Sequence, residues 1–406
     1  MIHSTLNSLF TKAGYLFAVI RSRFGPLRKE FLFMSFNGHY SDSPKAISEK
    51  IHEMHPEEPI TWLVSRERMG ELPSYVNGVD IKSDEAYMHL LTAKVIIDNI
   101  YCRGGLNTIG TVSYYKNKMM YAFTRRKGQI KLSTWHGTPL KKMGIDIRGS
   151  KENSFLGHPL TMVHGNQHTL DVMDRITFHQ IEMHLIGSPR NDVLFSSEKG
   201  MEVKKKLGLD ATTKIMLYAP TFRSDGNGMS LLNVKRSGID QMDMIDFDKL
   251  FACLTKKFGG EWVFIGRFHN FVEKEVDWKK LNNKYQGRII NGNNLDDMAD
   301  YLSCTDVLLT DSSSCMFDFS LTGKPCLLFF PDLKEYKEKE RGLYYDIEQL
   351  PFPCAVSFDE LLELIQDFSN DYYMNGVKFL LQTIGNVDDG NASVKVVRYI
   401  YEKINS

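Results

Sequence analysis

The sequence lacks an excess of charge of either sign, and it lacks a long apolar run. Its 406 residues include 50 Lys and Arg against 50 Asp and Glu, so no overall field attracts a polyanion. No stretch reaches the roughly 18 consecutive apolar residues of a membrane span, and the N-terminus does not have the pattern of a cleaved signal peptide. We therefore expect neither an integral nor a secreted protein, and no nucleic-acid partner.

Cysteine is scarce, and no two cysteines stand in a CxxC pair. The six cysteines are scattered along a chain that is long enough to bury a core without disulfides. This usage is typical of reduced thiols in a cytosolic protein.

Several familiar catalytic motifs are also absent. The sequence has no GxxxxGK[ST], no GxGxxG after an expected strand, no GxSxG and no HExxH. Their absence counts against a P-loop kinase, a standard dinucleotide oxidoreductase, an α/β-hydrolase and a zincin. No cofactor is expected and no carboxylate cluster demands a metal, although a requirement for a divalent ion stays open.

Apolar runs of strand length alternate with segments of helix length along most of the chain. This alternation favours an α/β fold with parallel sheets and right-handed crossovers. The polar stretch 196–214 divides eleven such runs into six and five, so we expect two Rossmann-like domains that face each other across a cleft. The runs are residues 31–36, 60–64, 94–99, 130–137, 160–165, 184–189, 214–220, 261–269, 288–293, 307–314 and 325–330.

These runs suggest the boundaries 1–30, 31–195 and 196–406, with a last helix that can cross back to the first domain. Residues 1–30 mix apolar and basic side chains, which is typical of a helix in an anionic membrane interface. A first helix that packs on its own domain with a solvated basic face explains the same composition, and both interpretations stay open.

Polar side chains follow the ends of many expected strands. In open parallel sheets ligands gather at the carboxyl ends of strands, so these side chains are candidates for a site. They are His136, His164, Arg190, Asp192, Thr221, Arg223, Arg267, His269, Asp311, Ser312, Ser313 and Ser314.

The stretch "TDSSSCMFDFSLTGKP" carries the clearest signal. Ser312, Ser313 and Ser314 follow Asp311 at the end of a strand and precede an expected helix. Hydroxyls and unpaired N–H groups at a helix N-terminus favour a phosphate. Ordinary capping by a serine is the alternative.

Two other strands of the same half also end in residues that suit a phosphate, namely Thr221, Arg223, Arg267 and His269. Guanidinium groups bind phosphate oxygens well, so these residues and the serines together predict a diphosphate site.

His136 stands in "WHGTPLKKMG", with Thr138 and Lys141 close behind it. A histidine with a pKa near 6.5 can accept a proton from an attacking hydroxyl at neutral pH. A histidine that braces the turn fits the same spacing.

His164 and His168 have the i, i+4 spacing of metal ligands. The glycine between them and the lack of a third ligand count against a metal site.

Six stretches in order resemble the CDP-glycerol glycerophosphotransferase family, the teichoic-acid primases and polymerases. They are "SFNGHYSDSPKAI", "WHGTPLKKMG", "GSPRNDVL", "YAPTFR", "GRFH" and "LLTDSSSCMFDFSLTGKPCLLFFPDL", and the resemblance covers roughly residues 31 to 400. It implies a GT-B-like fold and a peripheral protein on the cytoplasmic face of the membrane. The implied reaction transfers an alditol phosphate from CDP-glycerol or CDP-ribitol to a polyprenyl-diphosphate-linked saccharide or growing polymer, with release of CMP.

The resemblance also assigns roles to residues. It makes His136 the base that takes the proton of the acceptor hydroxyl, and His269 the residue that stabilises the diphosphate. Arg223, Arg267 and the turn of Ser312 to Ser314 neutralise the CMP leaving group. The other binding candidates are Thr138, Lys141, Arg190, Asp192, Thr221 and Asp311.

The motifs leave several alternatives open. They do not separate glycerol from ribitol donors, primase from polymerase, or wall polymer from capsule, although the short N-terminal part favours a primase or a short polymerase. A GT-B glycosyltransferase that uses a nucleotide sugar shares the fold and the phosphate cradle. A non-catalytic binding protein is the third possibility.

Overall fold

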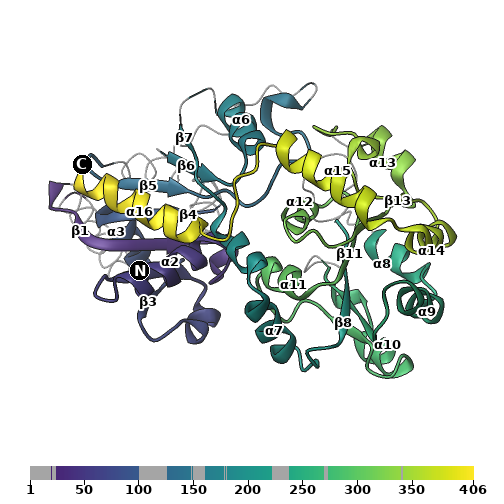
Figure 1. Ribbon diagram of the computed structural model, residues 1–406. Coiled ribbons are helices and arrows are strands. Elements are labelled where there is room, and N and C mark those ends of the chain that lie inside the picture. Colours follow the sequence, from purple (N-terminus) through teal and green to yellow (C-terminus); the bar gives the residue numbers. More distant parts are fainter. Residues whose placement is uncertain are drawn as a thin grey trace, which may run out of the picture.

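Two parallel sheets form the two halves of the molecule (Figure 1). The computed structural model describes residues 20, 24–99, 126–147, 149, 161–177, 179, 181–221, 237–268, 273–339 and 342–406. The first 23 residues apart from Ile20 therefore lie outside the described part, and with them most of the segment 1–30 that carries the possible membrane contact.

The first sheet has seven strands in the order β3-β2-β1-β4-β5-β6-β7, and all its pairings are parallel. Its first strand lies between the second and the fourth, so the chain reverses direction across the sheet at the β1/β4 pair. The strands are β1 (Arg28–Met34), β2 (Ile60–Val64), β3 (Val76–Asp80), β4 (Ala93–Asp98), β5 (Ile130–Ser133), β6 (Thr161–His164) and β7 (Glu182–Leu185).

The second sheet repeats this order with six parallel strands, β10-β9-β8-β11-β12-β13, and reverses at the β8/β11 pair. Such a reversal is the switch point at which doubly wound sheets bind ligands. The predicted α/β class with two Rossmann-like sheets is confirmed. The strands are β8 (Lys214–Ala219), β9 (Trp262–Gly266), β10 (Ile289–Asn291), β11 (Val307–Thr310), β12 (Cys326–Phe329) and β13 (Cys354–Ala355).

Each of the eleven apolar runs contains or overlaps a strand, but the described residues hold two more strands. β3 has the sequence VNGVD, with only Val79 buried, so it lies at the sheet edge with no apolar run to mark it. β13 is two residues long at the other sheet's edge. Buried central strands, by contrast, read as continuous apolar segments because both faces are covered.

Helices cover both sheets, and capping side chains fix where several of them begin. Asn166 accepts the Thr169 N–H at 2.9 Å at the start of α6, for example. None of the helices in the described residues is long and apolar enough to cross a bilayer. The helices are α2 (Asp42–Met54), α3 (Asp84–Thr92), α6 (Gln167–Ile176), α7 (Ser197–Lys206), α8 (Ser237–Asp243), α9 (Phe247–Phe258), α10 (Trp278–Lys284), α11 (Met298–Cys304), α12 (Cys315–Ser320), α13 (Leu333–Lys339), α14 (Phe358–Asp367), α15 (Asn370–Thr383) and α16 (Ala392–Asn405).

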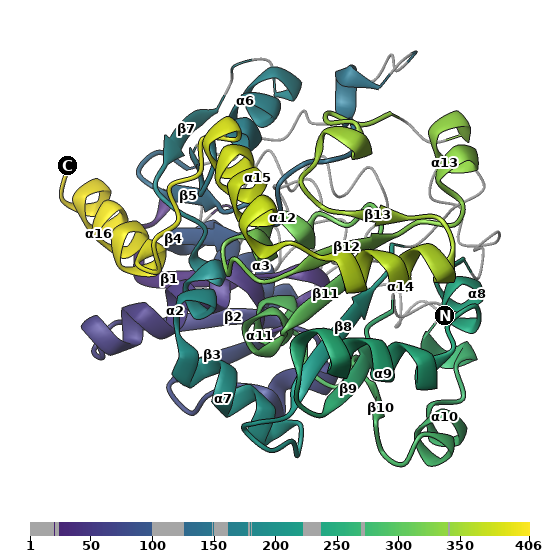
Figure 2. The same cartoon turned by 45° about the vertical axis from the view of Figure 1, so that its right-hand side comes forward.

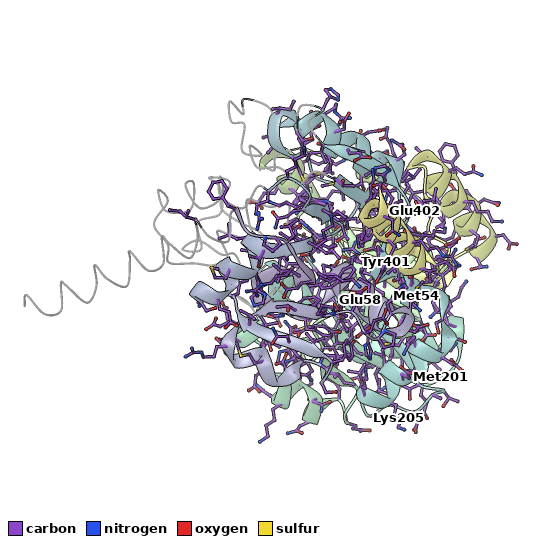
Figure 3. The ribbon with its side chains drawn as sticks, turned by 90° about the vertical axis from the view of Figure 1, so that its left-hand side faces the viewer. Met54, Glu58, Met201, Lys205, Tyr401 and Glu402 are labelled. Atoms are coloured by element: carbon purple, nitrogen blue, oxygen red, sulfur yellow. The ribbon has the colours of Figure 1, made fainter. Side chains whose placement is uncertain are left out.

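The last helix returns to the first half. Figures 1 and 2 show α15 beside the second sheet and α16 beside the first, joined by a short crossing segment. Val396, Val397 and Ile400 of α16 belong to the same buried cluster as strands β1 and β2. Tyr401 packs its ring 4.2 Å from that of His55 at the end of α2, and Figure 3 shows Tyr401 and Glu402 near the segment of Met54 and Glu58.

We expect Ile400→Ala to weaken the first half although it lies near the end of the chain. The side chain is fully buried, and truncating a buried isoleucine costs about 2–5 kcal/mol. Urea denaturation should show a lower midpoint. Phe379→Ala, which truncates an exposed side chain on α15, is the control and should change the midpoint little. Equal midpoints for Ile400→Ala and the unmutated chain would contradict the packing of α16.

Asp192 caps α16, because its carboxylate accepts the N–H groups of Ala392 and Ser393, each at 2.8 Å. We expect Asp192→Ala to lower the free energy of unfolding by about 1–2 kcal/mol, as lost caps do. Asp192→Asn keeps one acceptor oxygen and should lose less. The same urea titration measures both, and a larger loss for Asn than for Ala would argue against the cap.

Candidate active site

A cavity of about 460 Å³ lies where the two halves meet. His136 follows β5 of the first sheet, while the second sheet contributes residues that follow β8, β9 and β11. The carboxyl ends of both sheets therefore face one space, as the cleft prediction requires. The lining residues are Asp42, His136, Arg190, Ala219, Pro220, Thr221, Arg267, Phe268, Asn293, Asp297, Met298, Ala299, Ser313, Ser314, Cys315 and Asp318.

A second cavity, of about 230 Å³, shares part of this wall. His136, Thr221, Ser313 and Ser314 line both cavities, and Thr138, Lys141 and Ser312 line the smaller one. His136 and the turn of Ser312 to Ser314 thus lie at the boundary between two spaces.

The His136 side chain is held in one tautomer. Its Nδ1 lies 2.9 Å from the carbonyl oxygen of Asn99, which directly follows β4. A carbonyl oxygen only accepts, so Nδ1 carries the proton and donates it, and Nε2 keeps its lone pair. The edge-on ring of Phe36, with centroids 4.7 Å apart, fixes the orientation further.

Burial lowers the pKa of His136 to about 4, although the Asn99 carbonyl and the Asp42 carboxylate act in the other direction. Arg190 adds to the lowering through its positive charge. The imidazole is therefore neutral at neutral pH, and its Nε2 is able to take up a proton.

The loop that carries His136 approaches the serine turn very closely. A Cβ atom on Gly137 would lie 3.0 Å from Ser314 Oγ and 3.5 Å from an Arg190 guanidinium nitrogen. Trp135, just before His136, has φ at +51°, in the left-handed region that L-residues seldom adopt. Glycine after the histidine lets the two halves come together at this point.

Asp311 shapes the ends of β8 and β11. One of its carboxylate oxygens accepts the N–H and the hydroxyl of Thr221, both at 2.8 Å, and the N–H of Ser312 at 2.6 Å. The Thr221 and Ser312 hydroxyls lie 2.9 Å apart. Asp311 thus stabilises the loops that follow β8 and β11, whereas Ser313 and Ser314 line the cavities.

Arg267 lines the larger cavity, but its guanidinium donates to protein carbonyls. It bonds Gly292 and Leu295 at 2.8 and 2.7 Å and Asp296 at 2.7 Å, and it lies 5.0 Å from the centre of the Tyr301 ring. Arg267 therefore holds the loop 292–296 against the cavity. Its contact with a phosphate stays a prediction.

The remaining predicted residues divide between the site and the scaffold. Thr138 Oγ1 accepts the Asn166 amide at 2.8 Å, and Lys141 lies over the Tyr336 ring at 5.5 Å. Arg190 lines the larger cavity, but Asp192 lines neither cavity and caps α16. Arg223 and His269 lie outside the described residues.

The histidine pair at 164 and 168 is engaged within the protein. Nδ1 of His164 accepts the Asn166 N–H at 3.3 Å, and Nε2 of His168 lies 2.9 Å from the Pro139 carbonyl, to which it donates. Within the described ranges no group of three or more His, Cys, Asp and Glu side chains is placed to hold a metal ion.

Some residues of the site were not predicted from the sequence. Asn99 ends an expected strand and could have been included on that rule, but only its main-chain oxygen contacts His136. Asp42, Asp297 and Asp318 reach the cavity from the starts of helices or from within them. Asp42 and Asp318 lie inside two of the quoted stretches but do not follow a strand, and Asp297 lies outside all six.

Known proteins resemble this chain over nearly its whole length. The family model described as CDP-Glycerol:Poly(glycerophosphate) glycerophosphotransferase matches residues 16–402. The teichoic acid poly(glycerol phosphate) polymerase of Bacillus subtilis (strain 168) is 27% identical over 98% of this chain and 52% of its own length. The teichoic acid glycerol-phosphate transferase of Staphylococcus aureus (strain NCTC 8325 / PS 47) is 25% identical over 99% of this chain and 100% of its own.

The chain thus spans about half the length of the Bacillus polymerase and the full length of the Staphylococcus transferase. A solved structure of the wall teichoic acid polymerase TagF superimposes with a TM-score of 0.74 at 23% identity, covering 100% of this chain and 98% of that one. This likeness confirms the predicted GT-B-like arrangement of the two halves. On its sequence match, the chain belongs to the CDP-glycerol:poly(glycerophosphate) glycerophosphotransferase family.

Proposed function

We propose that this chain transfers glycerol phosphate from CDP-glycerol to a hydroxyl of a lipid-linked acceptor and releases CMP, in the synthesis of teichoic acid or a related polymer. The observation that carries the proposal is the neutral His136, with its Nε2 lone pair, at the boundary of two cavities. Family membership supplies the donor class.

The reaction needs one proton transfer and one displacement. Nε2 of His136 takes the proton of the acceptor hydroxyl, and the oxygen attacks the phosphorus that bears the glycerol. A new P–O bond forms while the bond from that phosphorus to the bridging oxygen breaks, so CMP leaves with the electron pair. Such transfers depend on positioning and on stabilisation of charge, which the enclosed site supplies.

The two halves take different roles in this proposal. Residues 31–195 bind the acceptor and carry the base, and residues 196–406 bind the donor. The turn of Ser312 to Ser314 and Arg267, with Arg223 and His269, hold the diphosphate, while Thr138, Lys141 and Thr221 contact the ligands. The lining of the two cavities supports the positions of Thr138, Lys141, Thr221, Arg267 and the serines.

Glycerol is favoured over ribitol as the alditol. The glycerol-phosphate transferase of Staphylococcus aureus matches 99% of this chain, whereas ribitol-phosphate polymerases of Bacillus spizizenii and Staphylococcus aureus match 53% and 70% of it. The acceptor is a polyprenyl-diphosphate-linked saccharide or the growing polymer. Because it is lipid-linked, the protein works as a peripheral protein at the cytoplasmic face of the membrane, and the basic, apolar composition of residues 1–30 supports that location.

We expect the purified protein to release CMP from CDP-glycerol only when a lipid-linked disaccharide acceptor is present. His136→Ala should slow this release about 10²–10⁴-fold, the usual contribution of a general base. His184→Ala is the control, because His184 lies on β7 outside both cavities and pairs with Glu182 at 2.7 Å. Product mass gives the number of units added.

CDP-ribitol in a parallel assay tests the choice of alditol. If folded protein bound CMP but released none from either donor, the proposed reaction would be wrong. A glycosyl product from a nucleotide sugar would then identify a GT-B glycosyltransferase.

The pH dependence of kcat/KM offers a separate check on the base. Protonation removes the Nε2 lone pair, so activity is retained above the pKa of His136 and lost as the pH falls through about 4. An unperturbed histidine would lose activity near pH 6.5. The rate of CMP release from about pH 3 to about pH 8, with recovery after return to neutral pH as the control, measures this. An acid limb near 6.5 would contradict the lowered pKa of His136.

A further inference from the structure

One buried guanidinium connects the base to both halves of the molecule. Arg190 lies in the short 3-10 helix η4 (Pro189–Phe195) after β7, and its side chain is 11% exposed. It donates to the main-chain oxygen of His136, to Asp42 Oδ2 at 3.3 Å and to Asp318 Oδ2 at 2.7 Å.

The partners of Arg190 come from different halves. Asp42 begins α2 in the first half, and its N–H donates to Asp297 of the second half at 2.5 Å. Asp318 lies on α12, the helix that follows the serine turn. The segment η4 itself contacts α2 and α16 on one side and α7 and α11 on the other. The guanidinium therefore sits at the junction of the two halves.

The second oxygen of Asp318 is also held. It accepts the Asn191 amide at 3.3 Å, and the same amide nitrogen donates to Asp388 at 3.1 Å. Asp388 lies in the segment between α15 and α16 and accepts the Ser188 N–H at 2.6 Å. The carboxylate that fixes Arg190 from the second half is thus part of a buried network and has little freedom to move.

The main chain at His136 needs such support. Trp135 has φ at +51°, a conformation that costs free energy and persists only when the surroundings hold it. The Asn99 carbonyl fixes the ring of His136, and Arg190 fixes its peptide oxygen. A small displacement of Arg190 would therefore move the base.

The charge of Arg190 is already balanced. Asp42 and Asp318 place one carboxyl oxygen each within 3.3 and 2.7 Å of its nitrogens, so protein groups already compensate its positive charge before any ligand arrives. A compensated guanidinium attracts a diphosphate weakly, whereas it is well suited to hold protein groups in a fixed geometry.

We propose that Arg190 is a positioning residue, which holds the main chain of His136 and links it to Asp318, so that the base is correctly placed only when the two halves are together. The expected effect of this role on kcat rests on the proposed function. It replaces direct substrate binding as the main role of Arg190.

The test compares Arg190→Gln and Asp318→Asn with the unmutated protein in CMP release and in binding of CDP-glycerol by calorimetry. We expect kcat to fall about 100-fold in Arg190→Gln, the size of effect that a displacement of about 1 Å produces. The dissociation constant for CDP-glycerol should stay within about two-fold. Combined with His136→Ala, Arg190→Gln should cause no further loss, because it acts through that residue. Arg66→Gln, at an arginine that is 83% exposed, is the control and should change neither quantity.

Titration of His136 by NMR provides a readout that needs no turnover. The charged and titratable groups that face its ring are Asp42, Arg190 and His164. Removing the positive charge in Arg190→Gln should raise the pKa of His136, and removing the negative charge in Asp42→Asn should lower it. If the pKa shifts in these opposite directions while no donor is turned over, the contacts of Arg190 and Asp42 with His136 are upheld and the proposed function fails.

Two results would overturn the proposal. One is a loss of CDP-glycerol affinity in Arg190→Gln that accounts for the whole fall in kcat/KM at unchanged kcat, which would make Arg190 a substrate-binding residue. The other is a further fall in the His136→Ala background. Arg190→Gln leaves the carboxylates of Asp42 and Asp318 without their cationic partner, so it can fail to fold. Asp318→Asn keeps the side-chain shape and then carries the test, with the same expected fall in kcat at unchanged affinity.

Discussion

The site depends on the close approach of two loops. They are the loop after β5, which carries His136 and Gly137, and the serine turn after β11, Ser312 to Ser314. At Gly137 even a Cβ atom would lie only 3.0 Å from Ser314 Oγ, so the main chain of the first half packs closely on the serine turn of the second. This contact brings the carboxyl ends of two independent parallel sheets to a common wall. His136 and the serines can then line the same two cavities although 175 residues or more separate them in the sequence.

Burial keeps His136 in its neutral form. Removing His136 from water disfavours its charged form, and the Asn99 carbonyl selects the tautomer with the lone pair on Nε2. The two arginines that line the larger cavity among the described residues already bond to protein groups, Arg267 to the carbonyls of the loop 292–296 and Arg190 to carboxylates. These arginines shape the walls of the cavity, so a positive charge beside the cavity is not by itself evidence of a contact with the ligand.

Much of the fold could be predicted because buried parallel strands are apolar throughout and polar residues follow them. That rule located the strands at the centre of both sheets, and it placed His136, Thr221 and the serines at the cleft. It missed β3 and β13, which are edge strands without an apolar run. Arg190 and Asp192 show where it fails, because they stand two residues apart after one strand. Arg190 faces the cavity, whereas Asp192 turns away to cap α16, and only the return of the last helix separates these outcomes.

The sequence by itself determined the α/β class, the division into two sheets and the chemistry available at the strand ends, because local periodicity and residue type decide these. Only the tertiary structure decided which strand ends face each other, which arginines are already paired, and how far the pKa of His136 falls. Those properties depend on burial and on contacts between residues far apart in the chain, such as Arg190 with Asp318 and Asp192 with Ala392. No local pattern encodes such contacts, because each forms only when both halves and the returning helix are in place.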